Sequence, residues 1–228
     1  NVKKEGLFII SDYGEGWKLC APILATGYYL AGQSMGLETA IVMQGVKTRE
    51  QVAEEPVKQL IGKLKKSNAI ILSLSNRLGK LGDIGTFRDC IKNGRHKYAM
   101  TTGLIGLKTD QTYELAEAIN INYKKVNKLG EKIKEQLDWA REIRIITVTG
   151  TNLKIDVTGH EAMLNTGYVK ENGSGGNIPA GEVYIAPIRT RVDGTLVIDG
   201  SSRHKRGTML IQKPIRMKPR SCVIHWTG

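Results

Sequence analysis

The sequence predicts an α/β protein, with a doubly wound parallel sheet in an amino-terminal domain and a smaller, mostly antiparallel β domain after it. In the first half, short apolar runs alternate with helix-like stretches, which is the pattern of parallel strands joined by crossover helices. After about residue 170 no helix pattern appears, and short strand-like runs separated by turn residues take over. We therefore predict an α/β domain at 1–138 and a β-rich, truncated domain at 139–228.

Apolar runs mark the expected strands of the first domain. A continuous apolar run bounded by polar residues, such as 6–11, is typical of a strand buried on both faces. Further strands of this domain are expected at 39–43, 69–74 and 97–102. Helices are expected at 17–30, 57–64, 83–93 and 126–137, where apolar residues recur at helical spacing and lysines fill many of the other positions.

The second domain is expected to consist of short strands and tight turns. Residues 153–157 alternate apolar and polar side chains, as a half-exposed strand does. The stretch Gly173-Ser174-Gly175-Gly176 and the pair Asp199-Gly200 are expected to be turns. Further strands are expected at 143–149, 183–186, 195–198 and 209–211.

Composition excludes several classes of protein. The chain has 228 residues, of which 40% are hydrophobic and 25% charged, so it is not disordered as a whole. Its three cysteines, Cys20, Cys90 and Cys222, have no CxxC spacing, which excludes a zinc ribbon or a thioredoxin-type site. Sparse cysteine favours a reducing compartment. With no signal peptide or membrane-length apolar run in the sequence, we expect a cytoplasmic protein without membrane contact.

The net charge of +12 raises the question of a nucleic-acid partner. The segment 201–220 holds seven Lys or Arg and no Asp or Glu. A solvated lysine-rich surface is the favoured interpretation of such charge. Any nucleic-acid binding is expected to be weak and to fall steeply with salt.

Several common site motifs fail by one residue. A dinucleotide fingerprint would need glycine where Leu19 stands, and a phosphate loop would need Ser or Thr at Leu81. His160-Glu161 begins a zinc-protease pattern, but Leu164 takes the place of its second histidine. The other histidines, His96, His204 and His225, lack ligand spacing. These failures argue against a nucleotide-binding enzyme.

One segment, Asn177 to Pro187, stands out. Its Pro-x-Gly turn places Glu182 at the head of a strand with apolar neighbours and no adjacent Lys or Arg. A carboxylate in that setting needs a cation, because an unpaired buried charge is costly. Two interpretations stay open from the residues alone: an ordinary exposed or salt-bridged glutamate, which is favoured, and a metal ligand.

Together with Gly194 to Gly200, this segment resembles the thermophilic metalloaminopeptidases of the aminopeptidase T, or leucyl aminopeptidase T, type. Weaker similarity runs through 6–11, 36–39, 101–104 and 143–153. The resemblance implies a metal-dependent aminopeptidase that releases amino-terminal residues from peptides. It also implies a homodimer, two divalent metal ions (zinc or cobalt), and Glu182 as the first carboxylate ligand.

The sequence departs from that family after the motif. No glutamate follows Glu182, and Arg189 stands where the family leads us to expect an acidic residue. The remaining ligand types are Asp193, Asp199, His204, Cys222 and His225. We therefore expect an incomplete metal site, with no catalytic residue beyond Glu182 and no peptidase activity in this chain alone. The alternative is a non-catalytic relative that binds an anionic partner through 201–220.

Overall fold

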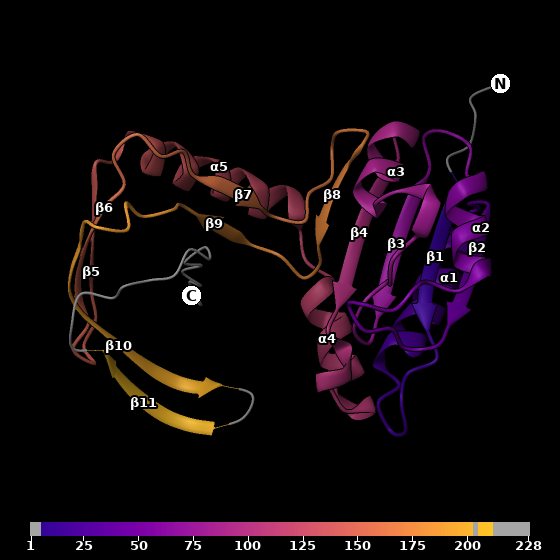
Figure 1. Cartoon of the computed structure of the whole chain (residues 1–228), viewed down its shortest axis with the longest axis horizontal. Coiled ribbons are helices and arrows are strands. Elements are labelled where there is room, and N and C mark those ends of the chain that lie inside the picture. Colours follow the sequence, from indigo (N-terminus) through magenta and orange to yellow (C-terminus); the bar gives the residue numbers. More distant parts are fainter. Residues whose placement is uncertain (1–5, 203–204, 212–228) are drawn as a thin grey trace. The chain divides into compact units, whose positions relative to one another are not determined.

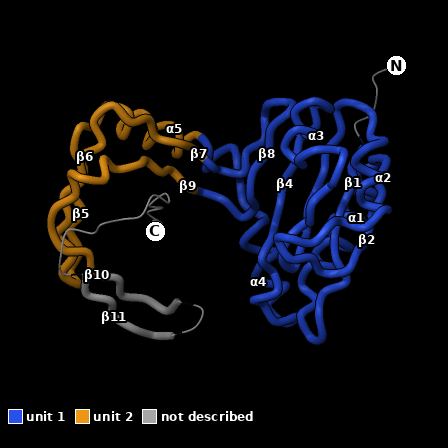
Figure 2. Tube along the Cα trace, in the orientation of Figure 1, with its two compact units in different colours: residues 1–127, 165–181 blue, residues 128–164, 182–228 orange. Residues whose placement is uncertain are grey.

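The computed structural model describes residues 6–202 and 205–211 of the chain. The chain forms two compact units, shown in separate colours in Figure 2. Unit 1 comprises 1–127 and 165–181, and unit 2 comprises 128–164 and 182–228. This division differs from the single boundary predicted near residue 139, because the chain leaves unit 1, returns to it for 165–181, and leaves again.

Unit 1 is built on a five-stranded parallel sheet with the order β2-β1-β3-β4-β8 (Figure 1). Its strands are β1 (Leu7–Asp12), β2 (Thr39–Gln44), β3 (Ala69–Leu74), β4 (Lys97–Thr102) and β8 (Ser174–Asn177). The first four agree with the predicted apolar runs to within a residue at each end. The α/β class and the parallel sheet are therefore confirmed.

Helices cover both faces of this sheet. They are α1 (Cys20–Ser34), α2 (Glu55–Lys63), α3 (Phe87–Gly94) and α4 (Thr112–Ile119), with α5 (Tyr123–Trp139) leading into unit 2. Side chains of β1 alternate between the faces, so Ile10 packs with Val57 of α2, whereas Ile9 packs with Ala25 of α1. Full burial of such an aliphatic side chain stabilises the fold by about 1.5–3 kcal/mol.

The strand β8 is a correction to the sequence analysis, which predicted a turn at Gly173 to Gly176. Gly175 and Gly176 pair in parallel with β4, and Gly175 lies opposite Tyr98. A Cβ atom at Gly175 would lie 2.2 Å from the Tyr98 carbonyl oxygen. Only glycine fits at that distance, so the residue type that suggested a turn is required for the strand.

Unit 2 contains a four-stranded antiparallel sheet with the order β11-β10-β6-β5. Its strands are β5 (Glu142–Ile146), β6 (Asn152–Asp156), β10 (Val192–Ser202) and β11 (Lys205–Ile211), and β7 (Met163–Asn165) pairs separately with β9 (Glu182–Tyr184). Buried Leu153 and Ile155 alternate along β6 as predicted. Asp199-Gly200, expected to turn, instead lies within β10 opposite Thr208 and Gly207.

Among the described helices, none combines the length and the apolar composition that a membrane crossing requires.

Candidate functional site at the carboxyl edge of the parallel sheet

The parallel sheet brings the carboxyl ends of its strands to one edge. β1, β2, β4 and β8 end there at Asp12, Gln44, Thr102 and Asn177. In open α/β sheets ligands bind beyond this edge, where the strand order reverses. Here the order reverses at β1, because β2 lies on one side of it and β3 on the other. The loops after β1 and β3 therefore lie where a fold of this kind usually holds its ligand.

Those two loops are tied together by a buried carboxylate. Asp12 is fully buried and its Oδ2 accepts the Ser75 backbone N–H at 2.7 Å. Its Oδ1 accepts the Ser75 hydroxyl at 2.6 Å and the Gly14 N–H at 3.0 Å. The donors are two amides and a hydroxyl, so neutral groups hold this anion. The contact joins the chain after β1 to the chain after β3, and it occupies the point where a ligand would otherwise enter.

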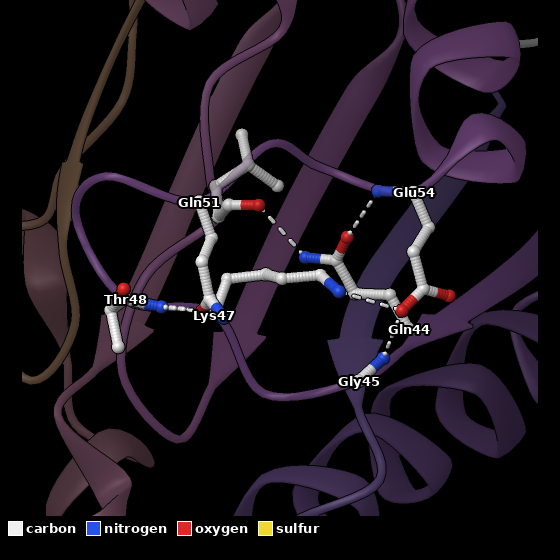
Figure 3. Close-up of polar contacts among 7 residues, drawn as sticks. Gln44, Gly45, Lys47, Thr48, Gln51 and Glu54 are labelled. Carbon is white, nitrogen blue, oxygen red and sulfur yellow. Dashed lines mark hydrogen bonds and ion pairs between the residues drawn. The ribbon is translucent and has the colours of Figure 1, made fainter.

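A second buried polar contact closes the loop after β2 (Figure 3). The fully buried Gln44 donates from Nε2 to the Leu78 carbonyl at 2.8 Å and accepts the Glu54 N–H at 3.1 Å. The Glu54 carboxylate in turn accepts from the Gly45 N–H at 2.9 Å and from Lys47 Nζ at 2.7 Å. The Lys47 ammonium, with the Gly45 amide, holds the pKa of Glu54 below its usual range.

The motif segment that begins at Asn177 leaves the sheet at this same edge. The Ile178 N–H donates to the Met100 carbonyl at 2.8 Å, and the Thr101 hydroxyl donates to the Ile178 carbonyl at 2.8 Å. The Ile178–Pro179 peptide bond is cis. Gly181 is the last residue of unit 1 in this segment and Glu182 is the first of unit 2. The motif is thus the path by which the chain passes from one unit to the other.

Two phenols lie close to this path inside unit 1. The hydroxyls of Tyr28 and Tyr123 are buried. Within the described residues no hydrogen bond to the Tyr123 hydroxyl is found, whereas the Thr101 hydroxyl, which donates to the Ile178 carbonyl, lies beside the Tyr28 hydroxyl and can accept from it. Burial raises the pKa of Tyr28 to about 12, and it raises the pKa of Tyr123 as well. Both phenols therefore stay protonated at neutral pH and can act as hydrogen-bond donors.

The structure separates the candidate ligands proposed from sequence. Glu182 opens β9 as expected and is half-buried, while Asp193 lies on β10 opposite Lys154 of β6. Within the described residues no group of three or more His, Cys, Asp or Glu could hold a metal ion. His204, Cys222 and His225 lie outside those residues.

Sequence analysis overlooked the residues that organise the carboxyl edge, although a signal was present. Asp12 and Gln44 are each the polar residue that closes a buried apolar run, which is where α/β proteins concentrate functional side chains. No comparable signal marks Tyr28 and Tyr123, because tertiary packing alone brings two helices' phenols to the same place.

Comparison with known proteins points to a different chemistry from the one expected. A family model for 2,5-dihydroxypyridine 5,6-dioxygenase (NicX) matches residues 114–225, just under half of the chain. The structure of 2,5-dihydroxypyridine dioxygenase from Pseudomonas putida KT2440 is similar, with a TM-score of 0.55 and 12% sequence identity. That similarity covers 85% of this chain and 53% of the dioxygenase chain, so this chain spans about half of its length. At such low identity, the similarity shows a shared fold. No curated protein matches the chain.

These findings overturn the metalloaminopeptidase resemblance. The aminopeptidase activity, the protease class and the peptide substrate were wrong, since the matching family is one of dioxygenases. The homodimer was implied by that resemblance and is not shown. The resemblance was carried by Asn177 to Pro187 and Gly194 to Gly200, and the physical reason for the error lies in the first of these segments. The backbone of Ile178 is bound to Met100 and Thr101 of β4, so this part of the motif serves the exit from the sheet and does not define a reaction.

The alternative of a non-catalytic binder that uses 201–220 is not supported by the comparisons either. Within that segment, 203–204 and 212–220 lie outside the described residues.

Proposed function

We propose that this chain is part of an oxygen-dependent enzyme that opens the ring of a hydroxylated nitrogen heteroaromatic compound. The supporting observation is the dioxygenase family match over 114–225. That range contains α5, the return of the chain to unit 1, and the motif with Glu182. The shared fold with a solved dioxygenase agrees with this proposal without deciding the substrate.

Dioxygenase chemistry inserts both atoms of O₂ into the substrate and usually requires an open-shell partner for oxygen. Non-haem iron held by two histidines and a carboxylate is a common solution. The described residues do not fit such a centre by themselves, because they contain no three-ligand cluster. No catalytic step is therefore assigned to them.

Glu182 remains our proposed carboxylate ligand for a divalent metal. It is half-buried at the head of β9 and lies within the matched range. The choice of two ions, and of zinc or cobalt, was tied to the aminopeptidase resemblance. A cytoplasmic location stays a proposal, favoured by the sparse cysteines.

The test uses the purified chain loaded anaerobically with Fe²⁺. Retained iron is measured after gel filtration, and O₂ uptake is followed after adding 2,5-dihydroxypyridine. We expect iron retention that falls in Glu182→Gln, and O₂ consumption equimolar with loss of the substrate's ring absorbance. Glu171→Gln, at an exposed carboxylate of unit 1, is the matched control and should leave both unchanged. Wild-type protein that neither retains iron nor consumes O₂ with this substrate would contradict the proposal.

A further inference from the structure

A cavity lies at the opposite, amino-terminal edge of the parallel sheet. Its volume is about 660 Å³, and its walls come from α2, the loop after α2, Phe8 of β1 and Glu38 just before β2. Small-molecule sites in proteins usually have about 300–1,000 Å³. The cavity lies entirely within unit 1, and no residue that lines it falls in the range matched by the dioxygenase model.

Part of the wall of this cavity is apolar. Leu60 and Leu64 contribute aliphatic side chains from α2 and its end, and Phe8 contributes a ring from β1. The ring folds back over Gly6, since a Cβ atom there would lie 2.7 Å from Phe8 Cε2. The missing side chain at Gly6 therefore makes room for an aromatic wall. A flat ring packs favourably against such a wall, by about 0.5–1.5 kcal/mol beyond its area burial in aromatic pairs.

The rim carries excess positive charge. Lys63, Lys65 and Lys66 line the cavity with exposed side chains, against a single acidic residue, Glu38. Because α2 ends at Lys63, its last carbonyls face this region and would by themselves favour a cation. Lys63 also interacts with Glu55, but that carboxylate is paired with Lys58. The three lysines therefore still outweigh the partial charges and the Glu38 carboxylate, so the rim favours an anion.

The lysine-bearing loop is held in a fixed conformation. The Asn68 side chain donates to the Lys65 carbonyl at 2.7 Å and accepts the Gly6 N–H at 3.0 Å. The Asn68 N–H donates to His96 Nδ1 at 3.2 Å, and His96 is almost fully buried. Because this backbone is already ordered, a ligand would not bear the entropic cost of ordering the loop.

We propose that this cavity binds a small aromatic carboxylate, with its ring against Phe8 and its carboxylate among the rim lysines. A bare inorganic anion would leave the apolar wall unused. A phosphate ester would lack the backbone amides of a helix amino terminus or glycine-rich loop that usually cradle it. This site is independent of the proposed ring-opening activity.

The test follows amide NMR shifts of the chain during titration with benzoate, at constant ionic strength. We expect saturable shifts at Ser67, Asn68 and Gln59. Benzyl alcohol, which keeps the ring without the charge, and acetate, which keeps the charge without the ring, should each bind at least about tenfold more weakly. Equal binding of benzyl alcohol would overturn the role of the lysines, and equal binding of acetate would overturn the role of the apolar wall.

Two variants place the ligand in the cavity. Lys65→Glu with Lys66→Glu should weaken benzoate binding by about tenfold, because two attractions become repulsions. Lys124→Glu with Lys125→Glu makes the same charge change at exposed positions of α5 and should leave the affinity unchanged. Gln59→Trp, on the exposed face of α2, should fill the cavity and abolish the shifts. Unchanged benzoate binding both in the Lys65→Glu, Lys66→Glu double variant and in Gln59→Trp would refute the site.

Discussion

Asp12 accepts both polar hydrogens of Ser75, the backbone N–H at 2.7 Å and the hydroxyl at 2.6 Å, although the two residues belong to different strand ends. This pair joins the loops after β1 and β3 at the point where the strand order reverses. A ligand that bound to the Asp12 side chain would have to displace these hydrogen bonds.

Asp12→Ala is expected to lower the free energy of unfolding by about 2–4 kcal/mol, because it leaves buried donors without an acceptor. Ser75→Ala removes only the hydroxyl and should cost about 1 kcal/mol. Hydrogen exchange gives a local measurement, in which the Ser75 amide loses protection in Asp12→Ala and keeps most of it in Ser75→Ala. Full protection of that amide in Asp12→Ala would contradict the assigned contact.

Gln44→Glu is expected to destabilise the protein by about 2 kcal/mol at neutral pH. The substitution keeps the size of the side chain but replaces the Nε2 donor with an oxygen that faces the Leu78 carbonyl. Protonation of the introduced carboxyl restores a donor, so the penalty should shrink as the pH falls. Denaturant unfolding of the variant and the wild type across acidic pH measures this. A penalty independent of pH would show that the amide donor does not matter.

Gly175→Ala and Gly27→Ala form a matched pair with opposite expected outcomes. In β8 the new methyl would overlap the Tyr98 carbonyl oxygen, so the strand should detach from β4 and the protein should lose stability. At the exposed helical Gly27 nothing lies within 4 Å of a Cβ atom, and alanine should stabilise α1 by about 0.5–1 kcal/mol. Thermal unfolding distinguishes the two. A stable Gly175→Ala variant with an intact sheet would contradict the close approach.

Tyr28 is expected to ionise late in an alkaline titration. Burial disfavours its phenolate and raises its pKa to about 12, against about 10 for an exposed tyrosine. Because the folded state resists ionisation, the stability that this phenol contributes is intact below about pH 10 and is lost as the pH rises through 12. Tyrosinate absorbance after a rapid pH jump reports this before the protein unfolds.

In that titration, Tyr28→Phe should remove amplitude from the late phase. If Tyr28→Phe removed amplitude only from the early phase, the burial of its hydroxyl would be wrong.

The parallel sheet was predictable because buried strands need apolar runs, and β1 and β3 are mostly apolar and are separated by helix-like stretches. The strand β8 was not predictable. Glycine is required at position 175 by the close approach of the Tyr98 carbonyl oxygen, and no local conformational preference of the sequence signals this. The position of Glu182 at the head of a strand was also predictable from its turn. The chemistry of Glu182 was not predictable, because the neighbouring motif residues serve the exit of the chain from the sheet.

The pairing of β8 with β4 has a consequence for synthesis. β4 ends at Thr102, and its partner begins at Ser174, after the chain has already built part of unit 2. At about 5–20 residues per second, a ribosome needs on the order of ten seconds to make the intervening stretch. Throughout that time the β4 edge of the nascent sheet has unpaired amides and carbonyls, which is a hazard for edge-to-edge association. The speed of translation between these two strands therefore sets how long that edge stays open to association.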